Sequence, residues 1–95
     1  MLGAQATGLP TGTDLNDIVN TGVYYAGNSS VAQTLVNCPT TTGFRLFVIP
    51  TNNSNHTPSR FAQIIICNGT TPTILIRDYT GSFTDWYVFK LEVVP

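Results

Sequence analysis

Side chains that could carry acid–base or nucleophilic chemistry are few in this sequence and are scattered along it. The single histidine, His56, lies in the most polar stretch of the chain, where a solvated loop residue is the simplest interpretation. Asp14 and Asp17 suit the start of a helix, where carboxylates interact favourably with the helix dipole, and Asp85 suits a turn. No Ser/His/Asp order, phosphate-binding loop or metal-ligand spacing occurs. We therefore expect no enzymatic activity, no catalytic residue, no bound metal and no cofactor.

The two cysteines, Cys38 and Cys67, both lie in or beside apolar stretches. They could form one disulfide if the fold brings their Cα atoms within about 7 Å. The alternative is a pair of buried free thiols that pack as small apolar groups. Together with one histidine they do not supply the four ligands of a structural zinc site.

The composition describes one small domain with an uncharged polar surface. The chain has 95 residues, of which 42% are hydrophobic and 9% charged, with a net charge of −1. Phosphate neutralisation needs a basic surface, so we expect no nucleic-acid partner. No apolar run approaches the roughly 20 residues of a membrane helix, so we expect no membrane partner. The 15 Thr, 8 Asn and 8 Gly are typical of extended strands joined by tight turns.

The pattern along the chain predicts an all-β module, a small antiparallel β-sandwich or barrel-like fold of about six short strands. We interpret residues 1–12 as a flexible linker or cloning remnant and residues 13–95 as a single β-rich domain. One short helical turn is expected over 14–20, with Thr13 or Asp14 as its N-cap. The six predicted strands are Gly22–Ala26, Val31–Val36, Phe44–Ile49, Phe61–Cys67, Thr73–Asp78 and Trp86–Val93.

Alternation of apolar and polar residues predicts which faces of the strands are buried. The run Ile64–Ile66 breaks the alternation, so we expect a central strand covered on both faces. A hairpin loop over 68–72 would pair Gln63 with Arg77, within hydrogen-bonding reach. In the last strand we expect one set of residues to face the core and the other to be partly exposed. The core set is Tyr87, Phe89, Leu91 and Val93, and the other is Trp86, Val88, Lys90 and Glu92.

Three aromatic residues are candidates for contacts outside the domain. Tyr24 and Tyr25 are adjacent, so one of them must face outward in a strand, and Trp86 lies opposite the predicted core face. Exposed aromatic rings beside Asn and Thr suit stacking on a sugar. They also suit a subunit interface, which we favour.

Short motifs occur in a characteristic order: Asp14-Leu15-Asn16-Asp17-Ile18, Gly22-Val23-Tyr24, Gly43-Phe44-Arg45-Leu46-Phe47-Val48, Phe61-Ala62-Gln63-Ile64, Ile76-Arg77-Asp78 and Asp85-Trp86-Tyr87. In this order the sequence resembles the knob-type domain of phage tail fibres and pyocin-type fibres, from residue 14 to residue 91. One departure is the loop 50–59, which is longer and richer in Asn than that family's pattern.

The resemblance implies a structural module of a virion appendage, either a tail fibre or a head fibre, that is synthesised in the bacterial cytoplasm. It implies a homotrimer, contacts with other virion or fibre components, and a contribution to host-surface attachment. Gln63 and Arg77 match the family's polar pair and would have a structural role. A reducing cytoplasm would favour free thiols. The alternatives are a receptor-recognition tip that binds a bacterial surface glycan, and a bacterial surface adhesion module unrelated to phage.

Overall fold

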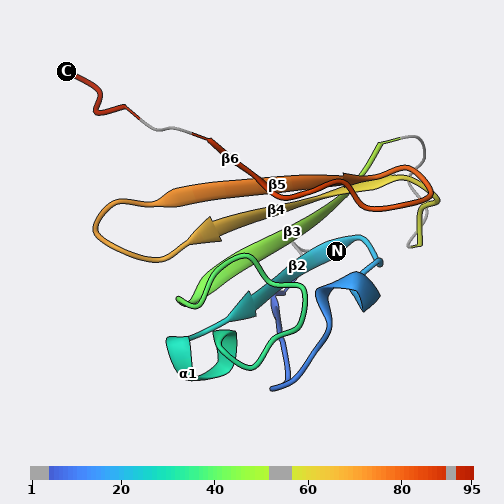
Figure 1. The fold of residues 1–95 in the computed structure, drawn as a ribbon, viewed down its shortest axis with the longest axis horizontal. Coiled ribbons are helices and arrows are strands. Elements are labelled where there is room, and N and C mark those ends of the chain that lie inside the picture. Colours follow the sequence, from blue (N-terminus) through green and yellow to red (C-terminus); the bar gives the residue numbers. More distant parts are fainter. Residues whose placement is uncertain (1–4, 52–56, 90–91) are drawn as a thin grey trace.

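The fold is a single antiparallel sheet with a small parallel strand added at one edge. The computed structural model describes residues 5–51, 57–89 and 92–95. Six strands follow one another in chain order across the sheet (Figure 1). Only the first pair is parallel. The strands are β1 (Thr7–Gly8), β2 (Gly22–Ala26), β3 (Phe44–Pro50), β4 (Phe61–Cys67), β5 (Thr73–Tyr79) and β6 (Tyr87–Phe89). The predicted all-β class is therefore confirmed.

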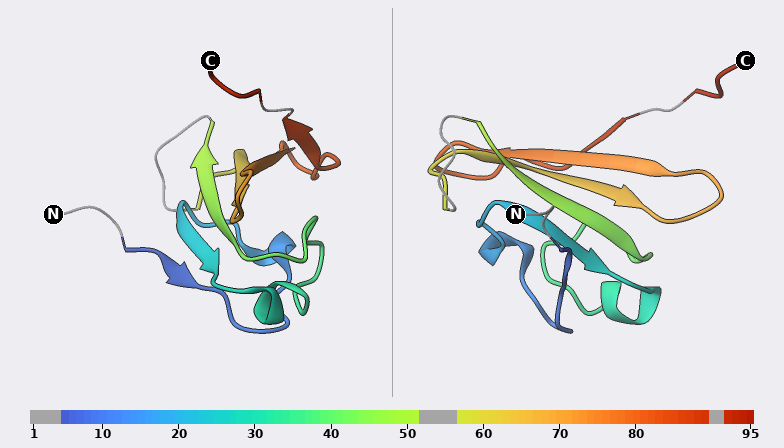
Figure 2. Two further views of the ribbon diagram at one scale, coloured as in Figure 1. Left: turned by 90° about the vertical axis from the view of Figure 1, so that its left-hand side faces the viewer. Right: turned by 180° about the vertical axis from the view of Figure 1, so that it is seen from behind.

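The second layer of the molecule consists of short helical turns and loops, not of a second sheet. A 3-10 turn, η1 (Leu15–Asp17), and the loop after the short helix α1 (Ser29–Ala32) lie on one side of the sheet (Figure 2). We call this side the inner face. Alternate residues of the central strands point into it, and the buried core contains Leu15, Phe44, Leu46 and Ile65.

The β4–β5 hairpin has the register that the sequence predicts. Gln63 lies opposite Arg77, and Ile65 lies opposite Leu75. With a five-residue loop between the two strands, this pairing buries Ile65 and Cys67 on the same face of the sheet. This register places Gln63 and Arg77 side by side on the inner face.

The segment Val31–Val36 is not a strand, contrary to the prediction. Asn28 caps the short helix α1, since its side chain accepts a hydrogen bond from the Val31 N–H at 3.0 Å. Ala32 is buried by the helical turn. A local N-cap of this kind outweighs the weak strand preference of the β-branched residues.

The last strand is shorter than predicted, and its inward and outward sides are reversed. Val88 pairs with Leu75, whose side of the sheet is the inner one, so Tyr87 and Phe89 point outward. Both are more than half exposed. Val93 lies beyond the strand and is 94% exposed, and the predicted core residue Leu91 lies outside the described residues.

The N-terminal segment takes part in the fold. Thr7 and Gly8 pair with Tyr24 and Tyr25 of β2, and Leu9 is buried in the core. A domain boundary at residue 12 therefore does not coincide with an edge of the fold. The expected N-cap is Asp14, whose side chain accepts from the Asn16 N–H of η1.

Candidate interface surface and the Gln63 network

A buried polar pair holds β4 and β5 to the η1 turn on the inner face. The Arg77 Nε–H donates to Gln63 Oε1 at 2.8 Å. The Gln63 amide nitrogen donates to the carbonyl oxygens of Leu15 and Ile18 at 2.8 and 2.9 Å. Gln63 is fully buried and Arg77 is 5% exposed. The Gln63 side chain thus supplies hydrogen-bond partners both to the carbonyl groups at η1 and to Arg77. Its own amide oxygen and nitrogen are also paired, as is usual for a buried polar group.

Aromatic rings take the place of some hydrogen bonds around Arg77. Its guanidinium carbon lies 3.7 Å from the ring centre of Phe83 and 4.6 Å from that of Trp86. Its Nη2 is buried and has no hydrogen-bond partner among the described residues, so the π-faces supply attraction in place of a hydrogen bond. Burial lowers the pKa of Arg77 to about 10, and the charge of Asp14 opposes that shift. Arg77 therefore remains a cation at neutral pH.

Asn37 joins the two ends of this arrangement. The side-chain amide of Asn37 donates to Asp14 Oδ1 at 2.8 Å, and the backbone carbonyl oxygen of Asn37 accepts from Trp86 Nε1 at 3.2 Å. Asn37 has a φ of 57°, a left-handed conformation that asparagine tolerates better than most residues. We call Asp14, Asn37, Gln63, Arg77 and Trp86 the Gln63 network. It connects η1, the loop after α1, β4, β5 and the approach to β6.

Acid is expected to weaken the network at Asp14. Hydrogen bonds from Asn37 and from the Asn16 N–H lower the pKa of Asp14 below its usual value of 3.8. Because the folded-state pKa is the lower one, ionised Asp14 stabilises the fold fully above about pH 3.8, and this contribution is lost as pH falls through the folded-state value. Melting curves should show a smaller acid-range loss of Tm for Asp14→Asn than for the wild type. Parallel curves for the two proteins would contradict this.

The three candidate aromatic residues do not form one site. Tyr24 and Trp86 are half-buried on the inner face, and the Tyr24 hydroxyl donates to the Asn20 carbonyl at 2.6 Å. Burial raises the pKa of the Tyr24 hydroxyl. Tyr25 points to the opposite side and is 42% exposed. A shared sugar-stacking platform of all three rings is therefore not present.

The side of the sheet away from the core, which we call the outer face, is a continuous apolar surface. Within the described part of the chain, η1 and the loop after α1 both lie on the other side (Figure 2). Ile49, Tyr87 and Phe89 are 45%, 62% and 52% exposed, and the isoleucines that β4 and β5 place on this face are half-buried. Its large side chains are Val23, Tyr25, Phe47, Ile49, Ile64, Ile66, Ile74, Ile76, Tyr87 and Phe89.

The outer face was not predicted, because Ile64–Ile66 were expected to be covered on both sides of the sheet. Ile65 is buried on the inner face, as expected, whereas Ile64 and Ile66 on the outer face are only half-buried. The three consecutive isoleucines were the available signal. Contiguous apolar surfaces of this extent are typical of interaction sites.

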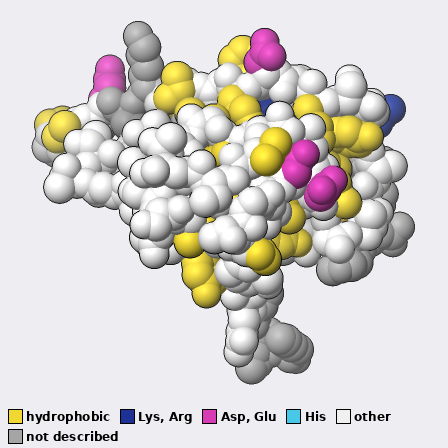
Figure 3. All heavy atoms as spheres, turned by 60° about the horizontal axis from the view of Figure 1, so that its bottom comes forward, with side chains coloured by type: hydrophobic (Ala, Val, Ile, Leu, Met, Phe, Trp, Pro, Cys, Tyr) yellow, Lys and Arg dark blue, Asp and Glu magenta, His cyan; other side chains and the backbone are white. Residues whose placement is uncertain are grey.

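The side opposite the outer face, where η1, α1 and the loop after α1 lie, has a more polar surface. Figure 3 shows mostly uncharged polar and backbone atoms there, with hydrophobic atoms in separate small groups. This matches the large share of Thr, Asn, Ser and Gly in the composition. One side of the molecule is therefore apolar and the other mostly uncharged and polar, as expected of a domain that associates through one face.

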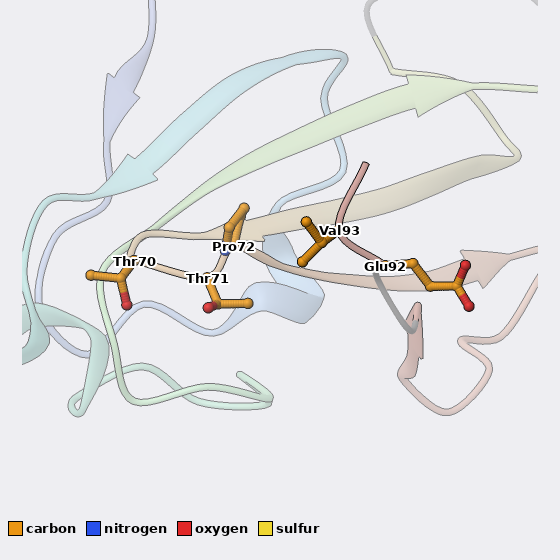
Figure 4. A pocket seen from close by; sticks show the side chains of 5 residues that line it. All are labelled: Thr70, Thr71, Pro72, Glu92 and Val93. Carbon is orange, nitrogen blue, oxygen red and sulfur yellow. The ribbon is translucent and has the colours of Figure 1, made fainter. Parts of the chain in front are cut away.

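A shallow pocket of about 250 Å³ lies between the β4–β5 loop and the C-terminal residues (Figure 4). No aromatic ring lines it, so it lacks the flat surface that sugar recognition uses. Its walls are formed by Thr70, Thr71, Pro72, Glu92 and Val93. We assign it no function.

Groups that could support other chemistry are not assembled in the described residues. No cluster of three or more His, Cys, Asp or Glu side chains that could hold a metal ion occurs among them. Cys38 and Cys67 are both free, and the Cys38 Sγ donates to the Thr40 carbonyl at 3.2 Å. His56 lies outside the described residues. No described helix has the length and hydropathy needed to cross a membrane.

Comparison with known proteins identifies the fold. No family model matches the chain, and no curated protein matches its sequence. A solved structure of the C-terminal part of the R1 pyocin fibre of P. aeruginosa superposes with a TM-score of 0.75 at 18% identity. The match covers 97% of this chain and 23% of the fibre chain. The fold of this chain is therefore similar to that of a part of a pyocin fibre.

Proposed function

We propose that the chain is a non-enzymatic structural module of a phage fibre or related virion appendage. In this proposal identical copies associate through their outer faces, and the arrangement is a homotrimer. The observation that carries the proposal is the continuous apolar outer face on a fold shared with a pyocin fibre. The Gln63 network has the supporting role of keeping the sheet rigid.

The physical argument for association is the cost of leaving the outer face in water. Burial of apolar surface is worth about 25 cal/mol per Å², and Ile49, Tyr87 and Phe89 keep about half or more of their surface exposed in the single chain. The net charge of −1 gives identical copies little reason to repel each other. A fibre that brings copies together by its own geometry would add effective concentration to this attraction.

We propose further that the module contributes to host attachment as part of this assembly, since several copies multiply weak surface contacts. Tyr25 is the one candidate aromatic residue on the outer face, where it lies near the β1 edge, opposite Gly8 and Arg45. In the proposed assembly this position is at the rim of the contact between copies, where a ligand can still reach it. If attachment uses it, binding of the chain to an array of bacterial polysaccharides should fall in Tyr25→Ala with an unchanged melting curve. Equal binding by both proteins would leave Tyr25 without a ligand role.

Sedimentation velocity tests the assembly directly. Over a wide range of concentration we expect a species with the mass of about three chains, unchanged by reductant because both cysteines are free. A species of single-chain mass at every concentration would contradict self-association of this module. A stable dimer would contradict the homotrimer and keep the interface.

A further inference from the structure

Two opposite charges stand on an otherwise apolar outer face. Of the outward-pointing strand positions that the structure describes, only Arg45 on β3 and Asp78 on β5 carry a charge. Both side chains are exposed. No ion pair or side-chain hydrogen bond of either one is found among the described residues. Each is therefore a free charge beside an apolar surface.

The register places these two charges at opposite corners of the face. Arg45 lies opposite Ile66 of β4, and Asp78 lies opposite Ala62 of the same strand. They are therefore four residues apart along the sheet and two strands apart across it. With about 3.3 Å per residue and about 4.8 Å per strand, the separation is roughly 16 Å. A direct ion pair within one chain is out of reach.

The surface between the two corners consists of apolar side chains. Phe47, Ile64 and Ile76 occupy its centre, at positions that follow from the strand register. The outer face of β2 to β6, whose strands are three to seven residues long, has a flat area of roughly 450 Å², before the relief of its side chains is counted. This is more than half of the roughly 800 Å² that each partner buries in a standard specific interface.

Association through this face would bring both charges to the edge of a dry contact. An unpaired charge at such a place loses water and gains nothing, which opposes binding. A second copy of the same chain carries the complementary charge at the other corner of the same face. In a closed symmetric assembly every copy makes the same contacts. A pair formed between one corner of a copy and the opposite corner of its neighbour therefore recurs at each interface.

We infer that Arg45 of one copy pairs with Asp78 of a second copy, and that this pair fixes the register in which the outer faces meet. The inference rests on the proposed self-association and adds the residues that orient it. The apolar centre provides the attraction between copies. The charged corners select one relative alignment of the two faces among the many that an apolar surface alone would allow.

Charge reversal provides the test. We expect Arg45→Asp and Asp78→Arg, each alone, to weaken self-association by about ten- to a hundredfold in sedimentation experiments. The double variant R45D/D78R restores the pair in reversed order and should return to within a few-fold of the wild type. Asp17 is an exposed acidic residue in η1, on the other side of the molecule. Asp17→Arg makes the same charge change as Asp78→Arg and should leave the association unchanged.

The possible results distinguish the Arg45–Asp78 pairing from the proposed self-association on which it rests. If the wild type associates and neither single reversal weakens it, the pairing is wrong and the assembly stands. If the wild type itself stays at single-chain mass, the proposed assembly fails. Arg60 borders the Asp78 end of the face, so loss of association in Arg60→Asp with none in Arg45→Asp would also overturn the pairing. Melting curves of all variants show whether the fold is intact.

Discussion

Replacing Gln63 by methionine is expected to lower the free energy of unfolding by about 3–5 kcal/mol, the largest loss among single substitutions in the Gln63 network. Methionine has a similar shape and leaves little cavity. It removes two hydrogen bonds to the carbonyls of Leu15 and Ile18 and the acceptor of the Arg77 Nε–H. Arg77 would remain a buried cation without its amide partner. Urea denaturation followed by tryptophan fluorescence measures the change.

A double-mutant cycle separates the loss of the pair from the loss of packing. Arg77→Met alone should cost less, about 1–3 kcal/mol, because it leaves one glutamine oxygen unpaired and no buried charge. The double variant Gln63→Met/Arg77→Met should be more stable than Gln63→Met alone, since it removes the orphaned cation. If the two single costs simply add, Gln63 and Arg77 do not act as a unit.

Replacing Ile64 by lysine is expected to abolish self-association while the single-chain fold persists. Ile64 lies on the central strand β4 and points to the outer face. In a single chain the lysine amine can reach water along the open face, at a cost of about 1 kcal/mol or less. In an assembly the same charge would be buried at the centre of the contact. Light scattering should show at least a hundredfold weaker association, which corresponds to about 2.7 kcal/mol.

A matched substitution on the other side of the molecule controls for the added charge. Val36 is 48% exposed and lies in the loop that covers the inner face. Val36→Lys should therefore keep the native mass of the wild type. Equal loss of association in both variants would mean that net charge, and not the outer face, governs the assembly.

Much of the sheet could be predicted from the sequence because its central strands have strong local patterns. The bounds of β2 and β4 agree with the prediction, and so does the register of the β4–β5 hairpin. A short turn between two β-rich runs leaves few pairings open. The pairing of Gln63 with Arg77 follows from that register, whereas the bonds from Gln63 to η1 depend on long-range packing that no local pattern encodes.

Two of the errors, the sides of the last strand and the covering of Ile64–Ile66, have a common physical origin in the apolar outer face. Alternation identifies a buried side only when the opposite side is polar. β6 itself contains only Tyr87, Val88 and Phe89, which are all apolar or aromatic, so alternation within it does not identify the buried side. The prediction therefore placed Tyr87, Phe89 and the preceding Trp86 on the wrong sides. The same ambiguity made Ile64–Ile66 look covered on both faces. β1 was missed because two small residues in parallel pairing have no periodic signal.

In the proposed assembly the outer face is covered by other copies of the chain in solution. Maleimide labelling of Ile76→Cys, located by mass spectrometry, tests it most directly, because Ile76 is at the centre of that face. Val36→Cys, on the opposite side, is the reference. We expect slow labelling at position 76 that becomes fast on dilution, and fast labelling at position 36 throughout. Equally fast labelling at both positions, independent of concentration, would contradict it.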